Sequence, residues 1–238
     1  MVLTKKPQII IIMPAYNAAK TLEKTYRDLP HGLANEVILV DDRSNDETVK
    51  IARELGLTTF IHQHNLGYGA NQKTCYWEAL KRKPDIVVMV HPDYQYDSSL
   101  TGELARPIID GRFDIMLGSR IKSRSEALKG GMPLYKYLGN RFLTLIENLV
   151  LGLNLSEYHT GFRAFSRKAL EKIPFQRFSN DFVFDQEVLI FAAKHNLRIG
   201  EIPVPIRYFP EASTIRLRGS LIYGFKTIWA LLKHNLFS

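Results

Sequence analysis

Apolar runs and amphipathic segments alternate along the first 118 residues of the chain, as in α/β proteins. Two runs, residues 8–13 and 85–90, are apolar after their first residue, as expected for strands buried on both faces of a sheet. The predicted strands cover residues 8–13, 36–41, 58–62, 85–90 and 113–117. Helices are predicted over about 17–30, from 44–46 to 56, and over 69–82. This order predicts a mostly parallel sheet that binds ligands beyond the carboxyl ends of its strands.

The alternation ends after residue 118, and longer helices follow a polar, glycine-containing loop at 120–133. The expected elements are a helix over 134–151, a strand over 160–165, a helix from 166, a helix over 182–195, extended chain over 198–207 and a helix over 219–236. Pro203 and Pro205 suit an edge strand, because proline donates no backbone hydrogen bond. We expect one domain over 1–238, with a first half at 1–118, a second half at 119–213 and a terminal helical segment at 214–238.

Two of these helices carry a continuous apolar face. In the helix over 134–151 the face consists of Leu138, Phe142, Leu145 and Leu149. In the terminal helix it consists of Leu221, Phe225, Ile228, Trp229, Leu232 and Leu236, with Lys226 and Lys233 away from it. Such a terminal helix packs on the sheet, pairs with a second copy of the chain or lies on a membrane surface. The sequence leaves these alternatives, and the oligomeric state, open.

Composition is that of a globular protein, with 45% hydrophobic and 24% charged residues. The single cysteine, Cys75, excludes a disulfide framework and a cysteine zinc site, so we expect a cytoplasmic location. The N-terminal apolar run stops after five residues at Pro14, which is too short for a signal peptide. No stretch approaches the length of a transmembrane helix.

The formal net charge of +8 favours anionic partners. Residues 120–141 contain six bases against one acid, Glu126. Nucleic acid is not expected, because the chain has no recognition helix and no RNP-like aromatic pattern. The charge therefore points to phosphorylated substrates or anionic lipid.

Polar residues follow the predicted parallel strands at 14–17, 41–44, 91–95 and 118–120, so they should meet at one edge of the sheet. Asp93 and Gln95 lie two residues apart after a buried strand, where both oxygens can point to one Mg²⁺ or Mn²⁺ ion. An ordinary turn without metal is the alternative. The segment NLGYG at 65–69 either offers backbone amides to a phosphate or forms a glycine turn. No dinucleotide or P-loop fingerprint is present.

Seven segments occur in a fixed order between residues 9 and 213. They are PAYN, VDDRSNDET, NLGYGANQKT, HPDYQYD, GSR, TGFRAFSR, and EIPV with RYFPEAS. This order resembles family 2 glycosyltransferases of the GT-A fold, and most of all the dolichyl- or polyprenyl-phosphate sugar synthases. The resemblance implies a Rossmann-like, mostly parallel sheet flanked by helices, with an acceptor-side loop. It also implies inverting transfer of a sugar from a UDP- or GDP-sugar.

By this resemblance, Pro14, Tyr16, Asn17 and Asp42 hold the nucleotide, and Asp42 reads the base. Tyr16 is otherwise a packing aromatic.

Asp93 matches the second acid of the DXD motif and Gln95 a further ligand of a divalent cation. His91 replaces the first acid, where it either ligates the metal or lies beside it. Ala18 stands where the family usually has glutamate. Both departures also fit a catalytically silent nucleotide-sugar-binding module.

On the acceptor side, Arg120 matches an arginine that binds phosphate in the family, and Lys136 and Arg207 fall near further basic positions. Residues 160–163 match the acceptor-side TSGFRA signature, with 158–159 replacing its usual start.

The acceptor decides which residues catalyse the reaction. A glycan hydroxyl requires a general base, for which Asp185 and Glu187 are the well-placed acids. A polyprenyl phosphate is already anionic and requires cations and an apolar surface instead, which the 120–141 stretch and the terminal helix provide. We therefore expect a polyprenyl-phosphate acceptor and a peripheral position at the inner face of the membrane.

Overall fold

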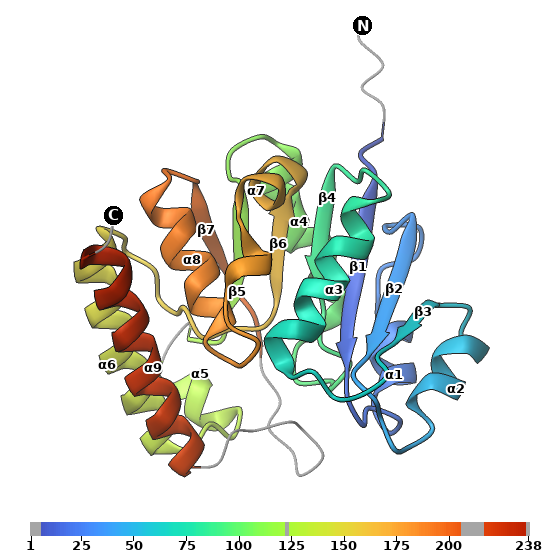
Figure 1. The fold of residues 1–238 in the computed structure, drawn as a ribbon, viewed down its shortest axis with the longest axis horizontal. Helices are drawn as coiled ribbons and strands as arrows, with labels where there is room; N and C mark the ends of the chain where they lie inside the picture. The colour runs from blue at the N-terminus through green and yellow to red at the C-terminus, as the bar shows by residue number, and fades with distance from the viewer. Residues whose placement is uncertain (1–5, 122–123, 206–216, 237–238) are drawn as a thin grey trace, which may run out of the picture.

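A seven-stranded mixed sheet forms the centre of the computed structural model, which describes residues 6–121, 124–205 and 217–236. Its strand order is β3-β2-β1-β4-β6-β5-β7 (Figure 1). The strands are β1 (Ile9–Ala15), β2 (Glu36–Asp41), β3 (Thr58–Ile61), β4 (Ile86–Met89), β5 (Ile115–Ser119), β6 (Arg163–Ser166) and β7 (Ile199–Pro203). Strand β6 runs antiparallel to both of its neighbours, and every other pairing in the sheet is parallel.

Strand β1 lies at the middle of the core, and all seven of its residues are buried. Ile10 and Ile12 point into one apolar cluster, whereas Ile9, Ile11 and Met13 point into a second cluster on the other face. Successive side chains of a strand alternate between the two faces, so an uninterrupted apolar run is what a strand covered on both sides requires.

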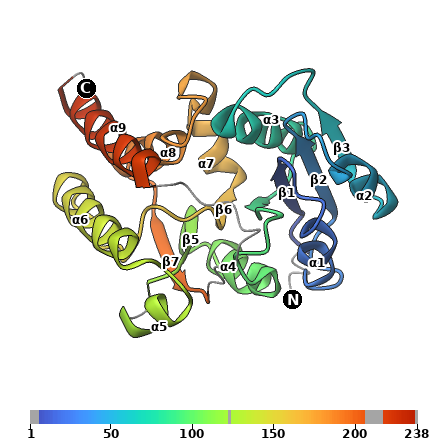
Figure 2. The same cartoon turned by 90° about the horizontal axis from the view of Figure 1, so that it is seen from below.

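Helices cover both faces of the sheet (Figure 2). On one face lie α3 (Tyr68–Leu80), α7 (Arg167–Lys172) and α8 (Phe184–Lys194); on the other lie α1 (Leu22–Arg27), α2 (Thr48–Glu54) and α4 (Thr101–Ile109). The remaining elements are η1 (Ser98–Leu100), α5 (Arg124–Lys129), α6 (Leu134–Leu151), η2 (Phe175–Arg177) and α9 (Leu217–Leu236). Helices α6 and α9 lie side by side beyond α8, where a small cluster joins Ala230 and Leu231 to Val183 and Ile190.

The expected α/β fold with a mostly parallel sheet is confirmed, and the predicted bounds of β2 and α6 coincide with the observed ones. The edge position expected for residues 198–207 is confirmed for β7, which ends at Pro203. Helix α4, which contains Pro107, was not among the predicted helices. Burial of Leu104, Ala105 and Ile108 outweighs the hydrogen bond that this proline removes. Part of the loop expected at 120–133 is the short helix α5.

Among the helices described, none combines the length and the apolarity that crossing a membrane would require.

Candidate functional site

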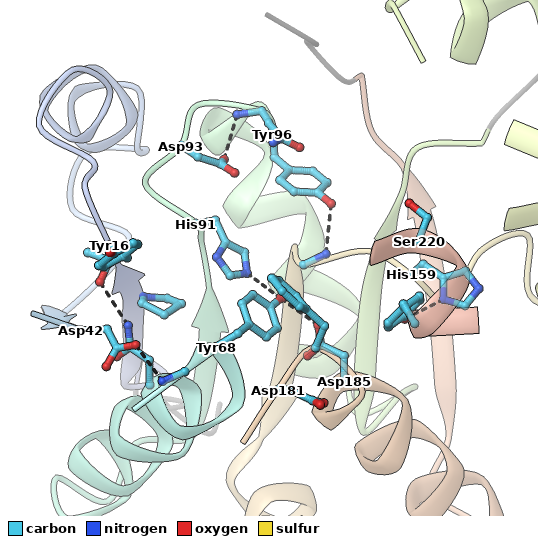
Figure 3. Close-up of a pocket in the computed structure, with 18 of the residues that line it drawn as sticks. Tyr16, Asp42, Tyr68, His91, Asp93, Tyr96, His159, Asp181, Asp185 and Ser220 are labelled. Carbon is cyan, nitrogen blue, oxygen red and sulfur yellow. Dashed lines mark hydrogen bonds between the residues drawn. The ribbon is translucent and has the colours of Figure 1, made fainter. Parts of the chain in front are cut away.

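A cleft of about 1030 Å³ opens at the carboxyl ends of β1, β2 and β4 (Figure 3). Tyr16 and Asp42 lie at one end of it, His91 and Asp93 in the middle, and His159 at the other end. Helices α6 and α9 contribute the wall beyond His159. The polar strand ends of the first half of the chain therefore converge at one edge of the sheet, as parallel pairing requires.

Three turns at this edge contain a non-glycine residue in the left-handed region. They are Asn17 (φ 51°), Arg43 (φ 65°) and Tyr94 (φ 58°), which follow β1, β2 and β4. Each such residue costs of the order of 1 kcal/mol and persists only where surrounding contacts impose it. The strain is therefore concentrated where the chain aims Tyr16, Asp42 and Asp93 into the cleft.

Asp42 is a fixed acceptor at the first end of the cleft. One carboxylate oxygen accepts the Leu66 N–H at 2.8 Å and lies 2.7 Å from His62 Nδ1, and the other accepts the Gly67 N–H at 3.0 Å. The NLGYG turn thus directs two backbone amides at Asp42. The other ring nitrogen of His62 lies 2.9 Å from the Thr74 hydroxyl, so His62 is a structural residue that holds Asp42 in place.

Asn17 joins the turns that follow β1 and β2. Its backbone N–H donates to Ser44 Oγ at 2.8 Å, and its side-chain oxygen accepts the Asn45 N–H at 2.9 Å. Pro14, Tyr16 and Asn17 all line the cleft, and Tyr16 is 53% exposed. An exposed ring beside a fixed carboxylate offers a base one stacking surface and one hydrogen-bond acceptor.

Asp93 is the carboxylate in the middle of the cleft. It accepts the Gln95 N–H at 3.1 Å, and burial raises the pKa of its carboxyl to about 6. A partly buried carboxylate whose charged form is disfavoured in this way is a site that a bound cation would stabilise. Gln95 also lines the cleft, so these two side chains fit a hard cation.

His91, which replaces the first acid of the DXD motif, lies in the middle of the cleft. Its ring stacks on Tyr68 with centroids 5.5 Å apart, and its Nε2 lies 3.2 Å from the Tyr68 hydroxyl. A side chain at Gly161 would come within 2.5 Å of this ring, so a glycine is needed there. Burial lowers the pKa of His91 to about 4, which keeps the imidazole neutral at pH 7. Among the described residues, no three His, Cys, Asp or Glu side chains are grouped to hold a metal.

Asp185 closes the floor of the cleft. It accepts the Tyr68 hydroxyl at 2.8 Å and lies 3.4 Å from the guanidinium of Arg163. Asp185 lines the cleft, whereas Glu187 does not; the Glu187 carboxylate accepts the Ser179 N–H at 2.6 Å. Of the two acids predicted as general bases, the structure brings only Asp185 to the cleft.

Arg163 is fully buried beneath the site. Its guanidinium donates to the carbonyl oxygens of Thr160 (2.7 Å), Tyr158 (3.0 Å) and Asp185 (3.0 Å). Within residues 160–163 only Gly161 lines the cleft. The segment that matches the acceptor-side signature therefore supports the floor of the cleft through buried contacts, and only Gly161 forms part of its lining.

Replacing Arg163 with methionine should lower the free energy of unfolding by about 3–5 kcal/mol, because it orphans three carbonyl groups and the buried side of Asp185. Urea unfolding measures this change. Arg167→Met is the matched control, because that arginine is half-exposed and its 3.8 Å pair with Glu171 is worth less than about 1 kcal/mol. Equal losses in the two variants would contradict this role.

Arg120 lies at the far end of the cleft, ion-paired with the fully buried Glu157. The Arg120 backbone N–H donates to the same carboxylate at 2.8 Å, and Asn140 Nδ2 does so at 2.8 Å. Burial acts to raise the pKa of Glu157, but Arg120 outweighs burial and the net shift is downward. Lys136 lines this end too, and burial and Arg120 lower its pKa.

A buried polar network joins α6, α8 and α9 behind Arg120. His159 Nε2 lies 3.1 Å from the carboxylate of Glu147, and His159 Nδ1 lies 2.9 Å from the Tyr223 hydroxyl. That hydroxyl also accepts Gln186 Nε2 at 2.6 Å. Tyr223 lines the cleft, so the terminal helix contributes directly to the site.

Sequence reasoning did not identify Glu157, Tyr68 or Tyr223. One signal for Glu157 was available, because it is the only acid between Glu147 and Glu171 and lies three residues before the start of the TGFRA segment. Tyr68 lies in the NLGYG segment, which was considered only for its backbone amides. For Tyr223 the sequence offered no signal, since its role depends on tertiary contacts. The prediction for Arg207 concerns a residue outside the described part of the chain.

Comparison with known proteins identifies the family. Residues 10–174 match the profile described as Glycosyl transferase family 2, so the chain belongs to that family. It is 31% identical over 233 residues to an uncharacterised protein of Methanocaldococcus jannaschii, covering 98% of this chain and 94% of the relative. It is 32% identical to the UDP-N-acetylglucosamine–dolichyl-phosphate N-acetylglucosaminyltransferase of Methanococcus voltae, covering 94% of each chain.

Two further relatives bear on the site and the fold. The dolichyl-phosphate hexose transferase of Haloferax volcanii is 29% identical, covering 84% of this chain and 82% of its own. Glucosyl-3-phosphoglycerate synthase of Mycobacterium tuberculosis, solved with Mn²⁺, UDP and phosphoglyceric acid, superposes with a TM-score of 0.72 at 19% identity. That superposition covers 96% of this chain and 78% of the synthase, and confirms the expected GT-A fold.

Proposed function

We propose that this glycosyltransferase moves a sugar from a UDP- or GDP-sugar to a polyprenyl phosphate, with inversion at the anomeric carbon. The arrangement of the cleft carries the proposal: a nucleotide end at Tyr16 and Asp42, Asp93 in the middle, and a basic end at Arg120 and Lys136. The names of the relatives from Methanococcus voltae and Haloferax volcanii, which both include dolichyl phosphate, support this acceptor class.

At the nucleotide end, the Asp42 carboxylate would accept the N–H of a uracil or guanine ring, and Tyr16 would lie against the base. In the middle, Asp93 and Gln95 would hold a divalent cation, whose chemistry is to neutralise the diphosphate as it leaves. His91 is neutral and contacts the Tyr68 hydroxyl, so in this proposal it would lie beside the cation and would not be one of its ligands.

At the acceptor end, Arg120 and Lys136 would hold the phosphate of the polyprenyl chain. One of its anionic oxygens attacks the anomeric carbon from the face opposite the diphosphate. The new carbon–oxygen bond forms as the bond to the diphosphate breaks, and the electron pair leaves with the nucleoside diphosphate. No proton moves in this step, so no general base is needed.

A hydroxyl acceptor is the second candidate, because Asp185 lines the cleft. Its carboxylate could take a proton from a sugar hydroxyl. A silent nucleotide-sugar-binding module is the third candidate, and it predicts binding without turnover.

The proposed function is tested by incubating the protein with UDP-, GDP- and dTDP-sugars, Mg²⁺ or Mn²⁺, and a short-chain polyprenyl phosphate or the corresponding alcohol. We expect a lipid-linked phosphosugar from the phosphate and nothing from the alcohol. Thermal shifts with the same nucleotide sugars identify the donor, because a ligand that binds only the folded state raises the melting temperature. A donor-induced shift without any product supports the silent module.

Asp42→Ala should weaken nucleotide binding by about 1.5–3 kcal/mol, the range for hydrogen bonds to a charged group. Calorimetry with UDP and GDP measures the change. His62→Gln is the matched control, because it alters the contact behind Asp42 and leaves the carboxylate in the cleft. Its effect should be less than about a third of that of Asp42→Ala. Unchanged affinity in a folded Asp42→Ala protein would remove Asp42 from the nucleotide site.

If the acceptor is a membrane lipid, the protein works at the inner, cytoplasmic face of the membrane as a peripheral protein. Support comes from the basic acceptor end of the cleft and from the terminal helix, which contributes Tyr223 to it.

A further inference from the structure

Helices α6 and α9 expose two rows of large apolar side chains, together called the outer face. Its members are Leu138, Phe142, Leu145 and Leu149 on α6, and Ile222, Phe225, Trp229 and Leu232 on α9. Each of these side chains is 50–75% exposed. Their spacing of three or four residues places each row along one side of its helix. Exposed apolar side chains that gather on adjoining helices mark an interaction surface, whereas single scattered ones need no explanation.

Helix α6 buries its polar side and exposes its apolar side, the opposite of an ordinary surface helix. Its buried residues are the polar Asn140, Thr144 and Glu147, whereas its apolar row faces outward. A helix at a water-exposed surface buries its apolar side. The polar side of α6 instead serves the cleft and the network around His159. The inversion therefore indicates that the medium outside α6 is apolar.

The two helices adjoin each other and the acceptor end of the cleft. Leu143 of α6 lies next to Gly224 of α9, within ordinary contact distance of a side chain built there. Lys136 of α6 and Tyr223 of α9 both line the cleft. An acceptor phosphate bound at this end would lie close to the outer face, where its hydrocarbon chain needs an apolar environment.

The charges on these helices select among apolar partners. Helix α9 contains no acid, and Glu147, the only acid of α6, is buried. The exposed bases on the two helices include Arg141 and Lys233, whereas the exposed Lys226 is already ion-paired with Asp181. Two copies packed through a shared outer face would bring these bases together, whereas an anionic bilayer surface would attract them.

From the outer face and its basic flanks we infer that α6 and α9 together dock on an anionic lipid bilayer, with the acceptor end of the cleft facing it. The docking is interfacial: the apolar rows enter the boundary between headgroups and acyl chains, and the bases meet the anionic headgroups. The inference rests on the proposed function for the purpose of the docking, but its test does not depend on transfer.

Vesicle sedimentation tests the docking. The protein should bind vesicles of phosphatidylcholine with about 25% phosphatidylglycerol, and bind pure phosphatidylcholine less. The variant Phe225→Gln/Trp229→Gln should lower partitioning into the mixed vesicles at least about tenfold, as should Phe142→Gln/Leu145→Gln. The matched control is Trp77→Gln/Ile61→Gln, which removes two side chains that are 53% and 42% exposed and lie on α3 and on the edge strand β3, away from α6 and α9. This control should bind as the unaltered protein does.

The two tryptophans of the chain provide an independent readout. In Trp77→Phe the only tryptophan is Trp229, and its emission should shift to the blue when the mixed vesicles are added. In Trp229→Phe the only tryptophan is Trp77, and its emission should stay constant. A shift of Trp77, or none of Trp229, would overturn the inference.

Transfer to a short-chain, water-soluble polyprenyl phosphate separates this inference from the proposed function. Transfer without vesicle binding overturns the docking and keeps the function. Vesicle binding through the outer face without transfer keeps the docking and counts against the function. Sedimentation velocity without lipid tests the competing occupant: a dimer that Phe225→Gln/Trp229→Gln dissociates would overturn the docking on lipid.

Discussion

Replacing Asp93 with asparagine should lower sugar transfer by about 10³-fold or more and, at the same time, raise the melting temperature of the ligand-free protein. The loss follows from the proposed role of this carboxylate in holding the cation that neutralises the diphosphate. Asparagine keeps an oxygen for the Gln95 N–H, so the turn after β4 should persist. Transfer assays over a range of Mg²⁺ and Mn²⁺ concentrations measure the first effect.

The gain in stability follows from the direction of the pKa shift. Burial raises the pKa of Asp93 from its ordinary 3.8 to about 6, so the folded state holds a proton that the unfolded state has lost over this interval. The carboxylate therefore lowers stability progressively as pH rises from about 4 to 6, and fully above 6. Removing the charge should restore about 1–2 kcal/mol at pH 7.5, or roughly 3–6 °C, and nothing near pH 4.

Asp110→Asn is the matched control for both effects, because that carboxylate lies at the surface beside Arg106 and Arg112. It should change neither transfer nor the melting temperature by a measurable amount. An Asp93→Asn protein that keeps full metal-dependent transfer would remove Asp93 from the proposed metal site. A melting temperature that fails to rise at pH 7.5 would show that burial of the charged Asp93 carboxylate does not destabilise the folded protein.

The fold was predictable because local periodicity and strand order determine most of it. The bounds of β2 and α6 follow from runs whose apolar spacing is unambiguous. The same spacing could not predict which side of α6 is buried. An apolar row normally faces the core, but in α6 the buried side is the one that carries Asn140 and Glu147. Only tertiary contacts reveal such an inversion.

The sequence predicted the cleft residues that follow the strands, but it did not predict the buried residues that hold them in place. Asp42, Asp93 and Arg120 all line the cleft, because parallel strands bring their carboxyl ends together. Asp185 and Glu187 are two residues apart on one helix, and their different orientations separate them. The sequence also gave no partner for Arg120, since Glu157 reaches it from a segment 37 residues away.

That partner changes how the acceptor should be tested. Arg120→Ala alone would leave the carboxylate of Glu157 buried without its guanidinium, and breaking a buried ion pair typically costs about 3–5 kcal/mol. A loss of transfer in this variant would then report unfolding as readily as a lost phosphate contact. The double variant Arg120→Met/Glu157→Gln removes both charges together, and its glutamine can still accept the Asn140 amide.

We expect Arg120→Met/Glu157→Gln to lower transfer to a polyprenyl phosphate by about 10²-fold, as for loss of a charge-assisted contact, while nucleotide affinity measured by calorimetry stays constant. Glu157→Gln alone is the matched control, because it keeps the guanidinium in the cleft, and it should lose less than about tenfold. Asp185→Asn should be tested beside them. A phosphate acceptor requires no base, whereas a hydroxyl acceptor requires one and can dispense with the arginine. If Asp185→Asn abolishes turnover and the double variant retains it, the acceptor is a hydroxyl and the polyprenyl-phosphate proposal fails.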